Sequence, residues 1–101
     1  MSAKIYSINE IKSIVEPIAK RYGVDKVFLF GSYARGEATE SSDIDFRVDR
    51  GQLRGLMALG GMYDDLQTQF GKSLDLLTTA SLDSSFLQNI ASEEILVYEA
   101  S

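Results

Sequence analysis

The sequence contains no cysteine and no histidine among its 101 residues. The absence of cysteine excludes disulfides, thiolate metal sites and thiol catalysis. The absence of histidine removes the commonest general base, the usual zinc ligands and every Ser-His triad. Any chemistry of this chain must therefore come from carboxylates, hydroxyls and a small number of cations.

Long apolar runs and basic charge are also scarce. No run approaches the roughly 20 apolar residues that a membrane span needs, and the N-terminus lacks a long apolar segment. The net charge is −5, whereas binding to nucleic acid takes clustered Lys and Arg. We therefore expect a cytoplasmic protein without direct nucleic-acid binding or membrane attachment. The length and the 45% hydrophobic content predict a single domain over residues 1–101.

Apolar periodicity and turn residues divide the chain into helices and strands. Ser7-Ile8-Asn9-Glu10 has the form of a capping box and opens the first helix, which Pro17 is expected to bend near Glu16. The order of elements predicts an α/β (α+β) fold, a small mixed sheet of three to four strands covered by helices. The predicted helices cover 8–22, 33–37, 53–70 and 82–91, and the predicted strands cover 26–30, 43–49 and 72–78, with 95–98 as strand or docked coil.

The longest predicted helix, 53–70, has apolar residues at helical spacing, which predicts one buried face. Gly60 and Gly61 weaken this helix, so that it is either broken near Gly60 or packed closely against a neighbour. The apolar residues of the predicted face are Leu53, Leu56, Met57, Leu59, Met62, Leu66 and Phe70.

A glycine-serine turn and a pair of acids stand ten residues apart. Gly31 and Ser32 follow an apolar strand, where a close backbone approach, an N–H and a hydroxyl suit a phosphate. Asp43 and Asp45 lie two apart on the next strand and so share one face. Taken alone, a Gly-Ser pair is ordinarily just a turn, and an Asp-x-Asp motif is ordinarily a solvated strand edge. The two motifs at this spacing, however, arise by chance in only roughly 0.5% of shuffled sequences.

Asp75 is the only charged residue inside the apolar run Leu74-Asp75-Leu76-Leu77. An acid there is costly unless it is paired or bound to a cation, although an exposed edge strand would also accommodate it. If its strand neighbours 43–49, Asp75 faces Asp43 and Asp45. Three clustered carboxylates repel one another, and ligation by oxygen alone favours Mg²⁺ or Mn²⁺ over zinc.

Several other polar residues have two readings. Arg35 can grip phosphate oxygens with its guanidinium or form a surface ion pair with Glu37 or Glu40. Arg47 shares the face of Asp43 and Asp45, either as a phosphate contact or as a counter-ion. Tyr33 could stack on a base or pack within the fold, and packing is the expectation. Lys72 is expected to be solvated.

Three segments of the sequence together resemble one known family. They are Phe30-Gly31-Ser32-Tyr33-Ala34-Arg35-Gly36-Glu37-Ala38, Ser41-Ser42-Asp43-Ile44-Asp45-Phe46 and Phe70-Gly71-Lys72-Ser73-Leu74-Asp75-Leu76-Leu77. They are similar to the signature of the polymerase-β-like nucleotidyltransferases, and most of all to the minimal, MntA-like group of prokaryotic antitoxins. The resemblance implies the nucleotidyltransferase fold and ATP-dependent transfer of AMP. It also implies two Mg²⁺ ions held by Asp43, Asp45 and Asp75, and a triphosphate held by Gly31 and Ser32.

The same resemblance implies a partner, because MntA-like proteins are encoded beside a HEPN-domain RNase toxin and neutralise it by attaching AMP to a tyrosine hydroxyl. We expect that activity here, in a hetero-oligomer with the toxin. One alternative is a non-catalytic antitoxin that inhibits its partner by forming a complex, for which the acidic charge is suitable. A third reading is a small-molecule nucleotidyltransferase. Such an enzyme needs a pocket for the acceptor, and 101 residues scarcely provide one.

Overall fold

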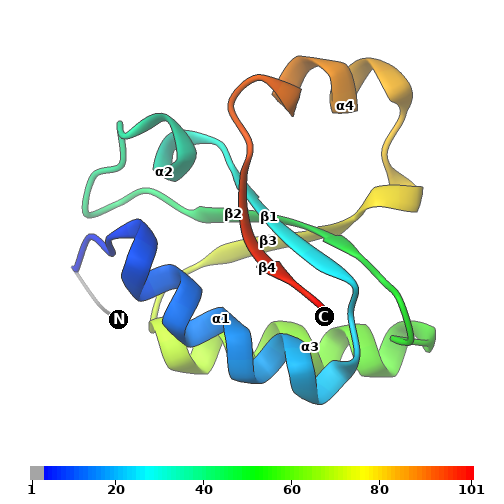
Figure 1. Ribbon diagram of the computed structural model, residues 1–101. Helices are drawn as coiled ribbons and strands as arrows, with labels where there is room; N and C mark the ends of the chain where they lie inside the picture. Colours follow the sequence, from blue (N-terminus) through cyan, green and yellow to red (C-terminus); the bar gives the residue numbers. More distant parts are fainter. Residues whose placement is uncertain (1–3) are drawn as a thin grey trace.

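A computed structural model describes residues 4–101 and shows a mixed sheet with helices on both faces (Figure 1). The predicted α+β class is confirmed, and each predicted element is present with ends shifted by a few residues at most. Within the described residues the elements are α1 (Ile8–Tyr22), β1 (Lys26–Phe30), α2 (Ser32–Arg35), β2 (Ile44–Asp49), α3 (Gly55–Phe70), β3 (Leu74–Thr78), a 3-10 turn (Thr79–Ser81), α4 (Ser84–Ala91) and β4 (Ile95–Glu99).

The strands lie in the order β3-β2-β1-β4. β1 pairs antiparallel with both β2 and β4, whereas β2 and β3 run parallel because α3 carries the chain back between them. The segment that the sequence left open between strand and coil is thus an edge strand. This order places β2, with its acidic residues, in the interior of the sheet.

Two helices cover one face of the sheet and bury the core. α1 and α3 lie side by side beneath the strands in Figure 1, and they pack against the alternate residues of β1 and β2. The largest fully buried side chains of this core are Phe46, Phe70, Ile11, Leu29, Ile44, Met62, Leu66, Val15, Val24, Val27 and Val48. Because β2 alternates buried and half-buried residues, its polar side chains all point to the opposite face.

α1 begins with the predicted capping box, in which Ser7 and Glu10 each accept a hydrogen bond from the other's backbone N–H. The helix runs without interruption through Pro17 to Tyr22, so the proline does not divide it. α3 is also continuous through its two glycines. A Cβ at Gly61 would lie 2.9 Å from the Tyr22 hydroxyl, which shows that this glycine allows α1 to approach closely.

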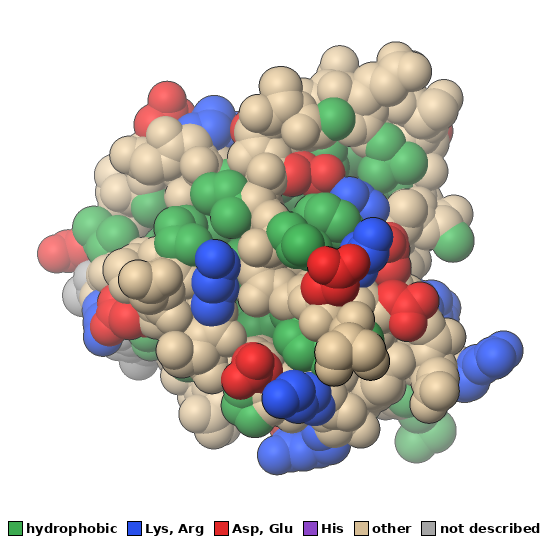
Figure 2. Space-filling model, viewed as in Figure 1, with side chains coloured by type: hydrophobic (Ala, Val, Ile, Leu, Met, Phe, Trp, Pro, Cys, Tyr) green, Lys and Arg blue, Asp and Glu red, His purple; other side chains and the backbone are tan. Residues whose placement is uncertain are grey.

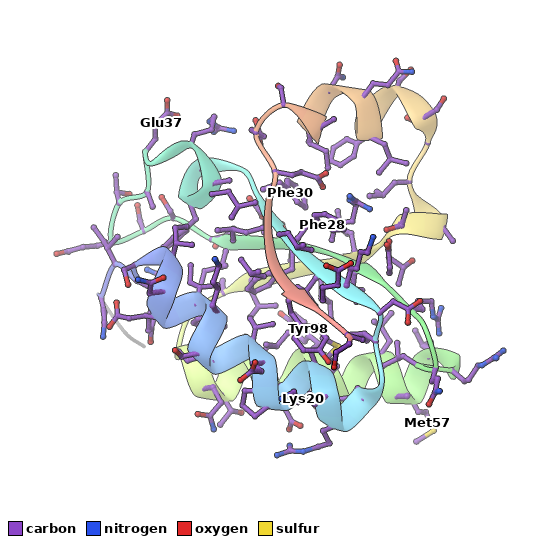
Figure 3. All side chains as sticks on the ribbon, in the orientation of Figure 1. Lys20, Phe28, Phe30, Glu37, Met57 and Tyr98 are labelled. Atoms are coloured by element: carbon purple, nitrogen blue, oxygen red, sulfur yellow. The ribbon has the colours of Figure 1, made fainter. Side chains whose placement is uncertain are left out.

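The predicted apolar face of helix 53–70 is correct at Leu53, which precedes α3, and at the C-terminal half, but it is wrong in the first turn of α3. Met62, Leu66 and Phe70 are buried, whereas Leu56 and Met57 are 83% and 92% exposed. Figure 3 shows Met57 pointing away from the rest of the molecule. The first turn of α3 extends past the sheet, so residues at the right spacing have no surface to pack against. Within residues 4–101, no helix combines the length and the apolar character needed to cross a membrane.

Candidate active site

The parallel pairing of β2 with β3 brings two of the predicted acids together. Asp45 is in register with Asp75, and directly paired residues of parallel strands direct their side chains to the same face. Asp43 precedes β2 by one residue and is exposed. The prediction that Asp75 lies beside the Asp-x-Asp motif is therefore correct for Asp45 in particular.

Asp45 is half-buried and surrounded by negative charge. Burial, then a hydrogen bond and the charge of Asp75, and then the charge of Asp43 raise the pKa of Asp45 to about 6, while Arg35 acts to lower it. Within the described part of the chain, no group of three or more acidic side chains is already arranged to hold a metal ion. The crowding of negative charge is thus concentrated at the pair of Asp45 and Asp75, and Asp43 adds to it through its own charge.

Gly31 connects the turn to this acidic pair. Its backbone has φ 76° and ψ −155°, a conformation that is essentially restricted to glycine. A Cβ at this position would overlap the carboxylate of Asp45, so the turn and the acid are in direct contact. Ser32 follows as the first residue of α2, which is a single helical turn. The two motifs that are ten residues apart in sequence therefore form one site.

Arg35, at the end of α2, lies between two carboxylates. Its Nε donates to Glu37 at 3.0 Å, and its Nη1 donates to both oxygens of Glu93 at 3.2 and 3.3 Å. These bonds raise the pKa of Arg35, which keeps it charged. The ion-pair reading of Arg35 is correct for Glu37, and it includes a second partner, Glu93, that the sequence did not indicate.

A pocket of about 540 Å³ contains most of these groups. One wall comes from the strand ends and α2, and the other comes from α4 and the turn after it. The lining residues are Phe30, Gly31, Ser32, Arg35, Asp43, Asp45, Phe86, Asn89, Ile90 and Glu93, so that five of the six predicted site residues line it. Asp75 is the predicted site residue that does not line this pocket, and its side chain is exposed on β3.

The α4 wall was missed by reasoning from the sequence. Figure 3 shows Phe28 and Phe30 in the layer between the sheet and α4, and the rings of Phe30 and Phe86 meet edge to face at 5.8 Å. Figure 2 shows acidic and basic side chains gathered among apolar ones on this face, near α4 and β4. One signal was available: Glu93 and Glu94 follow the C-terminus of a helix, where the helix dipole disfavours negative charge.

Arg47 serves as a counter-ion. Its Nε and Nη2 donate to the two oxygens of Glu94 at 2.6 and 2.9 Å, and both side chains are nearly buried, at 12% and 11% exposure. Nη1 donates to Thr79 at 2.8 Å, and the guanidinium lies 4.0 Å from the centre of the Phe28 ring. This network ties β2 to the turn between α4 and β4.

The expectation that Lys72 is solvated is wrong. Its side chain is buried, and the ammonium donates to the backbone oxygens of Lys4 and Glu40 at 3.1 and 2.8 Å. The bond to Glu40 holds the loop that carries Asp43 against β3. Tyr33 is buried beneath this loop, as predicted, with the Lys72 ammonium 6.0 Å from its ring centre.

Comparison with known proteins points to one family. The family model "Polymerase beta, Nucleotidyltransferase" matches residues 10–101. The chain is 38% identical over 88% of its length to "Putative protein adenylyltransferase MJ0435" of Methanocaldococcus jannaschii, and it covers 96% of that protein. It is 33% identical over 90% of its length to "Protein adenylyltransferase MntA" of Thermococcus cleftensis, and it again covers 96% of the relative.

Solved structures agree in fold. A structure described as a "putative minimal nucleotidyltransferase" is 27% identical with a TM-score of 0.76, and the match covers 89% of this chain and 95% of that one. A second structure shows a tri-AMPylated HEPN toxin of Shewanella oneidensis in complex with an MNT antitoxin. That match has a TM-score of 0.70 at 16% identity, and it covers 92% of this chain and 73% of that one, so it supports the fold alone.

Proposed function

Because the chain belongs to the polymerase-β nucleotidyltransferase family, we propose that it is a protein adenylyltransferase of the antitoxin type. It transfers AMP from ATP to a tyrosine hydroxyl of a partner HEPN-family RNase toxin and thereby neutralises it in the cytoplasm. The observation that carries this proposal is the contact between the Gly31 turn and Asp45, beside Asp75 on the parallel strand. A phosphate-sized turn and Asp45 thus share one open pocket, and Asp75 is paired with Asp45 on the neighbouring strand.

The donor triphosphate binds at Gly31, Ser32 and Arg35. Gly31 and Ser32 line the pocket and offer their backbone N–H groups and one hydroxyl as hydrogen-bond donors, and the charged guanidinium of Arg35 supplies a planar pair of donors. Because α2 is a single turn, the individual N–H groups and Arg35, and not a helix dipole, provide most of the attraction.

The acidic residues fit a divalent cation by their chemistry. Burial and the neighbouring acids Asp75 and Asp43 raise the pKa of Asp45 to about 6, and a cation would relieve the repulsion between these carboxylates. Asp43, Asp45 and Asp75 would hold two Mg²⁺ ions, with Mn²⁺ as a substitute. Metal ions in such a site neutralise triphosphate charge and lower the pKa of the attacking hydroxyl. Asp43, which is exposed on the loop before β2, would complete this ligand set.

In the reaction, the tyrosine oxygen forms a bond to the α-phosphorus as the bond to the bridging oxygen of pyrophosphate breaks. Asp75 accepts the proton of the tyrosine hydroxyl, because its carboxylate is exposed at the side of β3 where an acceptor can approach. Arg35 steadies the negative charge of the departing pyrophosphate. Each of these roles uses a carboxylate, a guanidinium or a backbone amide, so the absence of histidine from the sequence is consistent with the chemistry.

The acceptor is supplied by the partner protein. The pocket is open to solvent and is bounded on its outer side by α4 and the turn after it, which leaves space for a tyrosine presented by another chain. We propose that residues 1–101 act as one nucleotidyltransferase domain in a hetero-oligomer with the toxin. The complex of a tri-AMPylated HEPN toxin with an MNT antitoxin shows that a protein of this fold works in such an assembly.

The test is transfer of labelled AMP to the HEPN-family RNase by the wild type and by Asp43→Asn plus Asp45→Asn. We expect the double variant to lose transfer by at least about a hundredfold, because two charged ligands are removed. Asp64→Asn is the matched control, since Asp64 is an exposed acid on α3, and it should transfer normally. Undiminished transfer by the double variant would refute the assignment. If the double variant still forms the complex and still inhibits the RNase, inhibition comes from complex formation.

A further inference from the structure

One carboxylate of the chain occupies the groups that we assign to the triphosphate. The Gly31 N–H donates to Glu93 Oε2 at 2.7 Å, and Arg35 Nη1 contacts both Glu93 oxygens. The Glu93 side chain is 21% exposed, which places it within the pocket and not on its rim. A backbone N–H and a guanidinium converging on two oxygens is the arrangement in which proteins bind anionic oxygens.

A bound phosphate cannot make these contacts while Glu93 makes them. The Gly31 N–H can make one good hydrogen bond, because its single hydrogen points along one direction. A phosphate oxygen that accepts this bond must therefore replace Glu93 Oε2. Two anions held by the same guanidinium edge would also repel each other at close range. Nucleotide and Glu93 thus compete for the same position.

Glu94 determines how Glu93 can leave. Its carboxylate is held by the Arg47 fork on the inner side of the turn, and the N–H groups of Glu93 and Glu94 both donate to the Ile90 oxygen at 3.0 Å. Removing one partner of such a nearly buried ion pair is strongly unfavourable, so the backbone of the turn is fixed. Glu93 can then withdraw by rotation of its own side chain, while α4 and β4 stay in place.

We propose that Glu93 is an internal competitor of the donor nucleotide, which lowers the affinity of the pocket for ATP and assists the release of pyrophosphate. This role rests on the donor site proposed above. Because Glu93 belongs to the same chain, it is present at a high effective concentration and returns whenever the phosphate leaves. The pocket therefore favours a ligand with several phosphate contacts, which can replace all of the bonds that Glu93 makes.

The test measures binding of Mg·ATP and of inorganic tripolyphosphate to the full chain by calorimetry. Glu93→Gln keeps the size of the side chain and removes its charge, and it should bind both ligands about tenfold more tightly, the factor for one charge-assisted hydrogen bond. Glu37→Gln is the matched control, because Glu37 pairs with the Nε edge of the same Arg35 and is 66% exposed. Its dissociation constants should change less than about twofold.

A second readout follows the contact itself. In the nucleotide-free protein, Glu93→Gln should shift the amide resonance of Gly31, whereas Glu37→Gln should leave it in place. Equal affinities for wild type and Glu93→Gln, or weaker binding by Glu93→Gln, would overturn the competitor role and leave the donor site intact. An equal gain in both variants would attribute the effect to general charge and would also overturn it. If wild type and both variants bound neither ligand, the donor site itself would be refuted.

Discussion

Gly31 and Gly36 lie at the two ends of α2 and have nearly the same φ, 76° and 74°. Their surroundings differ, because a Cβ at Gly31 would overlap Asp45, whereas a Cβ at Gly36 would meet nothing within 4 Å among residues 4–101. Their ψ values differ as well, and that of Gly36 lies in the left-handed helical region that other residues can adopt. Gly31 therefore differs from Gly36 both in the strain of its backbone and in its contact with the acid.

Gly31→Ala should lower the free energy of unfolding by about 3 kcal/mol and Gly36→Ala by about 1 kcal/mol, because only the first adds a clash to backbone strain. Urea denaturation of both variants measures the difference. Equal losses would show that the close approach of Asp45 to the turn contributes nothing. Gly31→Ala should also lose Mg·ATP binding in calorimetry, since its Cβ displaces the carboxylate from the site.

Asp45 makes the stability depend on pH. Its pKa is about 6 in the folded protein, against an ordinary value of 3.8, so the folded state binds a proton more tightly than the unfolded state. The contribution of Asp45 to stability is therefore complete below about pH 4 and is lost as the pH rises through 6. Asp45→Asn removes this loss and should be more stable than the wild type at pH 7.

After allowance for solvent screening of a half-exposed group, the gain at pH 7 should be about 1 kcal/mol and should vanish near pH 3.5. Thermal denaturation at the two pH values, without divalent cations, measures it. Added Mg²⁺ should raise the melting temperature of the wild type and leave that of Asp45→Asn nearly unchanged. A variant less stable than the wild type at pH 7 would show that Asp45 is not under repulsion.

At the scale of elements, α3 contains one methionine that is buried and another that is exposed. Met62 is fully buried against the sheet, and Met57 is 92% exposed one and a half turns earlier. Met62→Ala should lower the free energy of unfolding by about 2–5 kcal/mol, whereas Met57→Ala should change it by less than about 0.5 kcal/mol. Urea denaturation of the two variants compares them. A large loss at Met57 would mean that the first turn of α3 is covered in solution, for example by a second chain.

The sequence predicted α1, β1 and β2 nearly to the residue, because capping, strand composition and period-two alternation are local. It could not predict that Leu56 and Met57 are exposed, since helical spacing does not reveal where the sheet ends. The same limit applies to the burial of Lys72, which depends on backbone oxygens of two distant loops. Propensity describes a segment, whereas burial is decided by what the fold brings against it.

At the scale of the whole molecule, the family resemblance drawn from the turn and the two acidic strands is confirmed by the match over residues 10–101. The roles of Asp43, Asp45, Asp75, Gly31, Ser32 and Arg35 remain predictions. Their proximity follows from sheet topology, which a motif of fixed spacing implies only through its family. The place of Glu93 after a helix C-terminus is unusual for an acid, but its contact with Gly31 could not be foreseen, because the two residues are 62 positions apart and the contact depends on the order of strands.

That strand order has a consequence for folding during synthesis. β1 is made before the other three strands and β4 after them, yet these two strands pair, and α1 also packs against β4. A nascent chain can pair β1, β2 and β3 while one edge of β1 and part of α1 still face solvent, a state prone to aggregation. Glu93 reaches Gly31 only when β4 docks, so the triphosphate turn of the unfinished chain is open. The docking of β4 and the binding of the Glu93 carboxylate to the Gly31 N–H therefore occur together.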